Sequence, residues 1–180
     1  MKLLTKLSFM LVLMSAVLLV SCAKEEVNPK EENPKEDPLK SVVALIKANE
    51  NFSTFYKVIQ ITGMESMLEE DKAYTVFAPD NDAWNVFMTK QGWSSIEDAN
   101  KSTLELIMKF HISEKGKIES KDFKNGLGIE IMFNQKKVTL LMEDNGTAKV
   151  VLGLTNATIT QKDIDAKNGI IHKIDHILSL

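Results

Sequence analysis

Between residues 39 and 110 the apolar positions recur mostly every three or four residues, which is the spacing of an amphipathic helix. The pattern predicts short helices around residues 42–46, 52–59 and 67–68, and longer helices at 80–88 and 102–110. An apolar run interrupts the helices and predicts a buried strand over residues 72–78. This half of the chain is therefore mainly helical.

After residue 128 the pattern changes to short apolar segments separated by turns that contain Asn or Gly. The predicted strands lie at 129–133, 137–142, 148–152, 157–161 and 170–178. Helices followed by a meander of strands predict an α+β domain with antiparallel sheets. No internal repeat is present, so we expect one copy of the domain.

The first 22 residues have the pattern of a targeting segment, with Lys2 and Lys6 preceding an apolar stretch at 7–20. That stretch is shorter than the roughly twenty residues that a membrane span needs. It ends in Leu19-Val20-Ser21-Cys22, which resembles a bacterial lipobox. In a lipobox the cysteine sulfur receives a diacylglyceryl group, and the signal peptidase cuts just before the cysteine. The alternative is an ordinary secretory signal with a chance cysteine.

Cys22 is the only cysteine in the chain. Once lipidated, it would leave the mature protein with neither a free thiol nor a disulfide. Thiol catalysis and cysteine-based metal sites are then excluded.

We expect three regions: a signal peptide at 1–21, a flexible linker at 22–38 that begins with the lipidated Cys22, and a globular domain at 39–180. The linker is rich in charge and proline and almost free of apolar residues, so it cannot bury a core. Fully extended, it could reach about 60 Å. Its Lys24-Glu25-Glu26 resembles an acidic export tag for the outer face of the bacterial outer membrane. The alternative is a solvated charge run.

Charge and motifs limit the classes of function. The net charge is −3 and no basic stripe is present, so nucleic acid is not expected as a partner. His172 and His176 have a metal-binding spacing only on a helix, and on a strand they would lie about 13 Å apart. The sequence lacks a nucleophile elbow, a phosphate loop and a dinucleotide fingerprint. We therefore expect no catalytic residues, no metal and no cofactor.

Two segments about ninety residues apart, Tyr74–Trp84 and Asn168–Leu178, resemble the two signature boxes of the fasciclin (FAS1) family. The first is a strand that runs through Pro79 into an acidic helix start, and the second begins with the turn dipeptide Asn168-Gly169. The resemblance implies a wedge of antiparallel β-strands with several N-terminal and inserted α-helices. It also implies a binding function rather than catalysis.

The same resemblance supplies candidate partner contacts. Animal adhesion proteins of the family have integrin-contact motifs at a Tyr-His pair and at an Asp-Ile pair. Here these stand as Phe110-His111, without the tyrosine hydroxyl, and as Asp163-Ile164. Two structural alternatives stay open: His111 as a buried hydrogen-bonding residue, and Asp163 as the cap of a turn.

Two further side chains have competing interpretations. Trp93 follows Gly92 and is either an exposed aromatic contact or a residue that packs over the end of the 80–88 helix. His172 shares strand parity with Ile170 and Ile174, so we expect it to face the core and to bond a backbone group.

Together these features predict a membrane-anchored, non-catalytic FAS1 binding module of the bacterial outer membrane, displayed at the cell surface, with the periplasmic face as the alternative. Its function would be adhesion or binding to another cell-surface protein. The alternative is an accessory lipoprotein of an outer-membrane nutrient uptake system that binds a glycan or a transporter. The ligand, a protein or a glycan, is left open.

Overall fold

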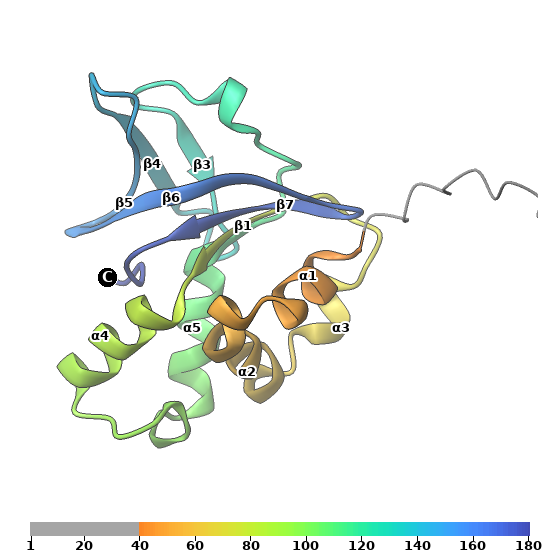
Figure 1. Ribbon diagram of the computed structural model, residues 1–180, viewed down its shortest axis with the longest axis vertical. Coiled ribbons are helices and arrows are strands. Elements are labelled where there is room, and N and C mark those ends of the chain that lie inside the picture. The colour runs from red at the N-terminus through yellow and green to blue at the C-terminus, as the bar shows by residue number, and fades with distance from the viewer. Residues whose placement is uncertain (1–39) are drawn as a thin grey trace, which may run out of the picture. The chain divides into compact units, whose positions relative to one another are not determined.

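The computed structural model describes residues 40–180 (Figure 1). Helices dominate the first half of this region, as the apolar spacing predicts. They are α1 (Val42–Ala48), η1 (Glu50–Phe52), α2 (Ser53–Thr62), α3 (Glu65–Leu68), α4 (Asn81–Gln91), η2 (Ile96–Asp98) and α5 (Lys101–His111), with η3 (Ser120–Asp122) further along.

The strands form one seven-stranded sheet in the order β2-β1-β7-β6-β5-β4-β3. They are β1 (Tyr74–Pro79), β2 (Ile112–Ser113), β3 (Gly128–Glu130), β4 (Lys137–Met142), β5 (Ala148–Leu152), β6 (Thr155–Ala166) and β7 (Gly169–Ile174). The predicted α+β class is confirmed. The sheet is mixed rather than wholly antiparallel, because β1 and β7 pair in parallel.

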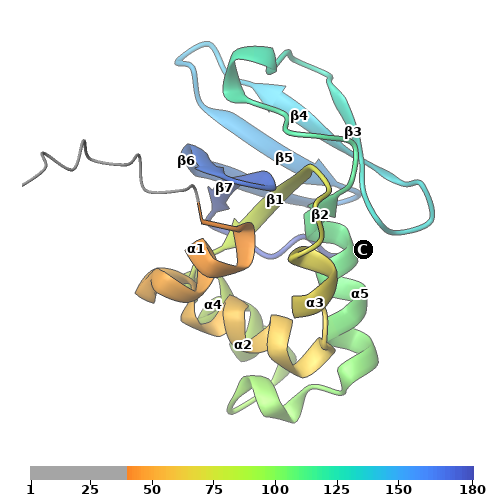
Figure 2. The same ribbon diagram turned by 90° about the vertical axis from the view of Figure 1, so that its right-hand side faces the viewer.

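The parallel pair joins the two sequence boxes directly, from Tyr74 opposite Gly169 to Pro79 opposite Ile174. Every residue of β1 is buried, as expected for a strand covered on both faces. One apolar cluster lies between these strands and the helices, and a second lies among β3–β6 and the end of α5. Figure 2 shows helices α1–α5 and strands β3–β5 on opposite sides of the β1–β7 pair.

Helix α4 begins and ends at residues with clear capping roles. The Asp80 carboxylate accepts a hydrogen bond from the Ala83 N–H at 3.0 Å, which satisfies one of the free donors of the first turn. The helix continues past the predicted end to Gln91, where Gly92 adopts the left-handed conformation that commonly ends a helix.

The hairpin between β6 and β7 differs from the sequence prediction. Ala166 pairs with Gly169, so the turn residues are Lys167 and Asn168, and Gly169 belongs to the strand. A Cβ atom on Gly169 would lie 2.6 Å from Val42 Cγ2 and 2.8 Å from the Tyr74 carbonyl oxygen. Glycine is required here because α1 and β1 approach the strand closely, not because of the turn.

Candidate functional site

Strand β6 carries an irregularity at Asp163, inside one of the predicted contact motifs. The pairing with β7 shifts register between Ile159 and Gln161 and again between Gln161 and Ile164. Asp163 has a φ of 58°, a conformation that Asp adopts more readily than most residues. Such a bulge redirects the side chains around it, so the positions of Asp163 and Ile164 both depend on it.

The Asp163 carboxylate is engaged by the segment that contains η3. It accepts hydrogen bonds from the Ser120 N–H at 2.8 Å and from the Ser120 hydroxyl. Partial burial raises the pKa of Asp163, but the bonds from Ser120 outweigh this effect and hold the pKa below its ordinary value. Residue 163 is exposed, but both carboxylate oxygens bond to Ser120, so Asp163 joins β6 to the start of η3 and does not cap a turn of its own segment.

Two more side chains hold the same loop against the hairpin. Lys117 Nζ donates to Asp165 Oδ1 at 2.7 Å and to the Ala166 carbonyl at 2.6 Å. His172 Nε2 lies 2.8 Å from the Ile118 carbonyl oxygen. These bonds keep the bulge of β6 in one conformation.

His172 faces the interior, which confirms the expectation from strand parity. Its Nδ1 accepts from the Asp163 N–H at 3.3 Å, so Nε2 carries the proton and donates to the Ile118 carbonyl. The ring lies between Phe77, with centroids 5.8 Å apart, and Phe123, at 5.1 Å. Burial lowers the pKa of His172 below its ordinary value, so the ring is neutral at pH 7.

Ile164 lies on the other side of the bulge and lines an open groove of about 480 Å³ between the hairpin and α1–η1. Its remaining lining residues are Leu45, Ala48, Asn49, Glu50, Asn51, Phe52 and Ile171. We call this the Ile164 groove. Its walls are apolar and its rim carries two amide side chains and a carboxylate, a composition suited to an apolar side chain of a partner.

The structure corrects the predicted contact role of the other motif, Phe110-His111, because both side chains are buried. Phe110 is 2% exposed and packs edge-on against Phe133, with ring centroids 5.0 Å apart. His111 is fully buried (0% exposed) at the end of α5. Neither side chain reaches the surface of the described fold, because the last turn of α5 packs against the sheet.

His111 has the structural role that stood as its alternative. Its Nε2 accepts from the Leu178 N–H at 3.0 Å, so Nδ1 carries the proton and donates to the Ile107 carbonyl at 2.7 Å. Burial lowers the pKa of His111 to about 4. The residue therefore fastens the C-terminal segment to α5.

Trp93 is half-buried just beyond the C-terminus of α4. Its backbone N–H donates to the Met88 carbonyl at 3.0 Å, and its ring contacts Phe87 edge-on, with centroids 5.7 Å apart. Packing over the helix end thus accounts for much of the side chain. The remaining ring surface is open to solvent.

Sequence reasoning missed a group of exposed apolar side chains around the turn between β5 and β6. Leu154 lies at that turn and is fully exposed. The available signal was an apolar residue beside Gly153, where turn chemistry favours polar ones. Asn156, a residue type typical of turns, lies within β6.

Within residues 40–180 no group of three or more His, Cys, Asp or Glu side chains is placed to hold a metal ion. None of the helices in this region is both long enough and apolar enough to cross a membrane. Cys22 and the linker lie outside the described residues.

The chain is similar in sequence to known proteins over most of its length. Residues 50–180 match the model of a family described as the fasciclin domain. Protein sll1483 of Synechocystis sp. is 29% identical over 142 residues, which is 79% of this chain and 74% of that protein. Human Stabilin-1 is 28% identical over 143 residues, which is 79% of this chain but 5% of Stabilin-1.

A solved structure of a FAS1 domain pair from the insect cell adhesion molecule Fasciclin I has the same fold. It matches with a TM-score of 0.67 at 18% sequence identity, over 79% of this chain and 52% of that chain.

Proposed function

This chain belongs to the fasciclin family, and from that premise we propose that it is a membrane-anchored, non-catalytic binding module that acts in cell adhesion or in binding a protein at the cell surface. The observation that carries the binding role is the open, apolar Ile164 groove in a domain of this family. Fasciclin I, whose domain pair shares the fold, is an insect cell adhesion molecule.

The polar groups near the groove support binding over catalysis. The Asp163 carboxylate bonds to Ser120, and both ring nitrogens of His172 bond to backbone groups. A general base needs a free lone pair within reach of a substrate proton. His172 therefore has no free lone pair, and the bonds from Ser120 lower the pKa of Asp163 and make its carboxylate a weaker base, so these two side chains favour surface complementarity over acid–base chemistry.

The proposed anchor is a lipid on Cys22. The support is the lipobox Leu19-Val20-Ser21-Cys22 at the end of an apolar segment. Two or three acyl chains, at about 0.8 kcal/mol for each buried methylene, give stable membrane attachment. The acidic run after Cys22 supports display on the outer face of a bacterial outer membrane.

The binding role is tested by filling the Ile164 groove. Ala48 is exposed on the groove rim, so Ala48→Arg should cover the groove with little loss of stability. Cells that display this variant should adhere less to collagen, to epithelial monolayers or to one another than cells with the unchanged chain. The matched control is Leu106→Arg, at an exposed position on α5. Equal adhesion of both variants and the unchanged chain would contradict a role for the groove.

The second candidate, a glycan-binding or transporter-binding accessory lipoprotein, is supported by the solvent-exposed part of the Trp93 ring, because aromatic faces bind sugar rings and apolar partner surfaces. Calorimetric titration with oligosaccharides that bind the unchanged chain but not Trp93→Ala would favour this candidate over adhesion.

A further inference from the structure

Exposed apolar side chains gather at one end of the described fold. Val86, Leu141, Leu154 and Leu180 are four of the five large apolar residues exposed within residues 40–180. The fifth, Leu106, lies on α5. We call the four residues the distal patch. Single exposed apolar residues need no explanation, but a contiguous group commonly marks an interaction surface.

The patch is built around a ridge. Leu154 is 102% exposed at the turn between β5 and β6, next to Gly153 with a φ of 59°. The side chain of Leu180 lies against this turn, with Cδ2 3.2 Å from where a Gly153 Cβ would stand. The Thr155 hydroxyl donates to the Ser179 carbonyl at 2.7 Å and so fastens the C-terminal residues beside the turn.

Leu154 separates two grooves. The α4 groove, about 370 Å³, lies between α4 and the C-terminal segment and includes Phe87, Lys90 and Ile177. The β4–β5 groove, about 560 Å³, lies on the other side of the turn and includes Leu141 and Glu143. Leu154 itself lines both grooves. A protruding apolar side chain with a groove on each side can fit a second surface of the same shape.

We propose that the distal patch binds the distal patch of a second copy of this chain. In a two-fold pair the same surface serves both copies, so the surface must complement itself. Leu154 of each copy would enter the α4 groove of the other. Each α4 groove then holds Leu154 of the other copy, and the β4–β5 groove of that other copy lies beside helix α4, which brings Glu143 toward Lys90.

The charges of the two grooves fit this arrangement. Lys90 forms none of the ion pairs found among residues 40–180, and Glu143 is joined to Lys149 at the surface. In the pair, Lys90 of each copy adds a second cation near Glu143 of the other copy, and the two-fold symmetry forms this contact twice. Such contacts at the rim of an interface determine which partners pair more than they add affinity.

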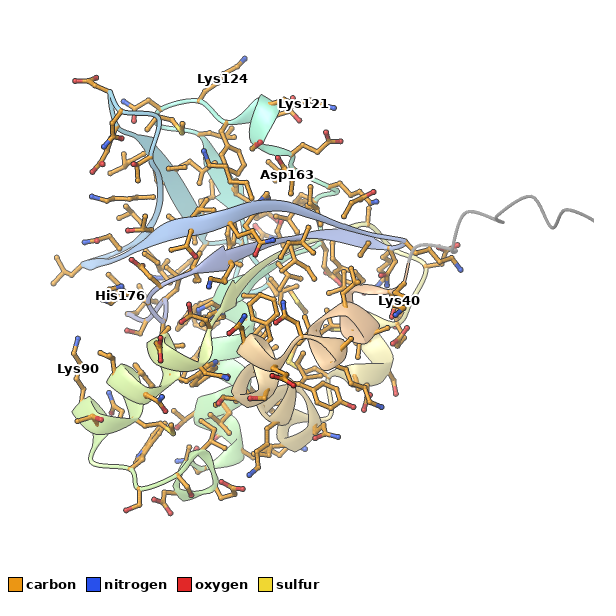
Figure 3. All side chains as sticks on the ribbon, in the orientation of Figure 1. Lys40, Lys90, Lys121, Lys124, Asp163 and His176 are labelled. Carbon is orange, nitrogen blue, oxygen red and sulfur yellow. The ribbon has the colours of Figure 1, made fainter. Side chains whose placement is uncertain are left out.

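The position of the patch determines how the two copies face each other. Strand β6 runs from Thr155 at the patch to Ala166, and the next residue, Lys167, donates from its N–H to the Lys40 carbonyl at 2.9 Å. Twelve residues of strand span about 40 Å. Figure 3 places His176, which lines the α4 groove, and Lys40 at opposite ends of the hairpin.

This step rests on the proposed lipid anchor. The linker joins the domain at Lys40, so the patch lies at the opposite end of the β6–β7 hairpin from this attachment. In a two-fold pair formed through the patch, the two Lys40 residues lie at opposite outer ends of the pair. The pair therefore joins copies on two facing membranes, and many weak pairs between the same two membranes add up.

The test uses the lipidated full chain inserted into phosphatidylcholine vesicles, with two dyes marking two vesicle populations. Co-clustering is followed by two-colour fluorescence correlation. We expect clustering when both populations carry the chain, and a loss of about tenfold or more with Leu154→Ser, since a buried central residue dominates such contacts. Leu106→Ser, also an exposed leucine, should cluster like the unchanged chain.

A charge exchange identifies the pairing. Vesicles that all carry Lys90→Glu, or all carry Glu143→Lys, should cluster less than unchanged ones, because each pair then brings like charges together twice. Mixing the two variant populations restores both opposite-charge contacts and should restore clustering. Absence of this recovery would overturn the proposed two-fold arrangement.

The remaining outcomes separate the patch from the anchor. Clustering with bare vesicles would show that the patch binds lipid, and no clustering by membrane-bound chains would overturn self-pairing while leaving the anchor intact. A chain that fails to enter vesicles contradicts the anchor. Self-pairing is then decided by sedimentation equilibrium: a dimer lost with Leu154→Ser supports it, and a monomer at all concentrations overturns it.

Discussion

His111 and His172 use both ring nitrogens for backbone groups, and they do so in opposite tautomers. His111 protonated at Nδ1 joins α5 to the C-terminal segment, and His172 protonated at Nε2 joins β7 to the loop before η3. A second proton on either ring would turn an acceptor into a donor that faces another N–H. Both side chains therefore stabilise the fold only while they are neutral.

The pKa of His111 predicts how stability depends on pH. Its pKa is about 4 in the fold and near 6.5 in the unfolded chain, so the unfolded state binds more protons between these values. Stability is full above pH 6.5 and falls as the pH drops toward 4, by about 3 kcal/mol from this residue. His172 acts in the same direction, because its pKa is also lowered.

Urea unfolding of the mature chain from pH 4.5 to 7.5 measures this slope. His111→Gln should be less stable at pH 7. Its free energy of unfolding should also depend less on pH, by the equivalent of about one proton taken up on unfolding. An unchanged slope would mean that His111 is already protonated in the fold.

Among the elements, the turn between β6 and β7 joins the sheet to the helices. Asn168 in this turn is 6% exposed. Its Oδ1 accepts from the Val42 N–H at 2.9 Å, and its Nδ2 donates to the Leu68 and Glu70 carbonyls at 2.7 and 3.0 Å. One side chain thus supplies hydrogen-bond partners to backbone groups in the first turn of α1 and at the end of α3.

Asn168→Ala should destabilise the domain by about 2–4 kcal/mol, because it leaves buried backbone groups without partners. Asn145→Ala is the matched control, since exposed Asn145 makes one local bond, to the Thr147 N–H at 2.8 Å. That change should cost less than about 1 kcal/mol. Thermal unfolding of both variants compares them, and equal losses would contradict the proposed role of the turn.

At the scale of the whole molecule, two surfaces lie near the two ends of β6. The Ile164 groove lies toward the Ala166 end of β6, and the distal patch surrounds Leu154, next to the Thr155 end. A lipid anchor would make the first proximal to the membrane and the second distal. The position of each surface relative to the membrane, rather than the chemistry of its groove, then decides which partners it meets.

Cys22→Ala tests the anchor on which this arrangement depends. Without the thiol no lipid can be attached, so we expect the variant to leave the membrane fraction, whereas the unchanged chain stays in it after a carbonate wash. Ser21→Ala is the control with the cysteine intact. A Cys22→Ala chain that remains with the membrane would show that another segment holds it there.

Several elements were predictable because their signal is local. The strands at 137–142 and 148–152 were predicted with their observed bounds, and Asp80 was expected at the start of α4. The predicted strands at 157–161 and 170–178 had wrong ends. Their lengths depend on the bulge at Asp163 and on how the C-terminal segment bonds to His111, which are contacts between distant residues.

The sequence by itself determined the alternation of helices and strands, the family resemblance and the interior position of His172. The first and the last follow from periodicity, which acts over a few neighbouring residues, and the resemblance rests on the two signature boxes. The tertiary structure decided that Phe110 and His111 are buried, that the Asp163 carboxylate is occupied, and that Leu154 stands between two grooves. Burial and groove shape arise where segments far apart in the chain pack together, and no local pattern records which segments meet.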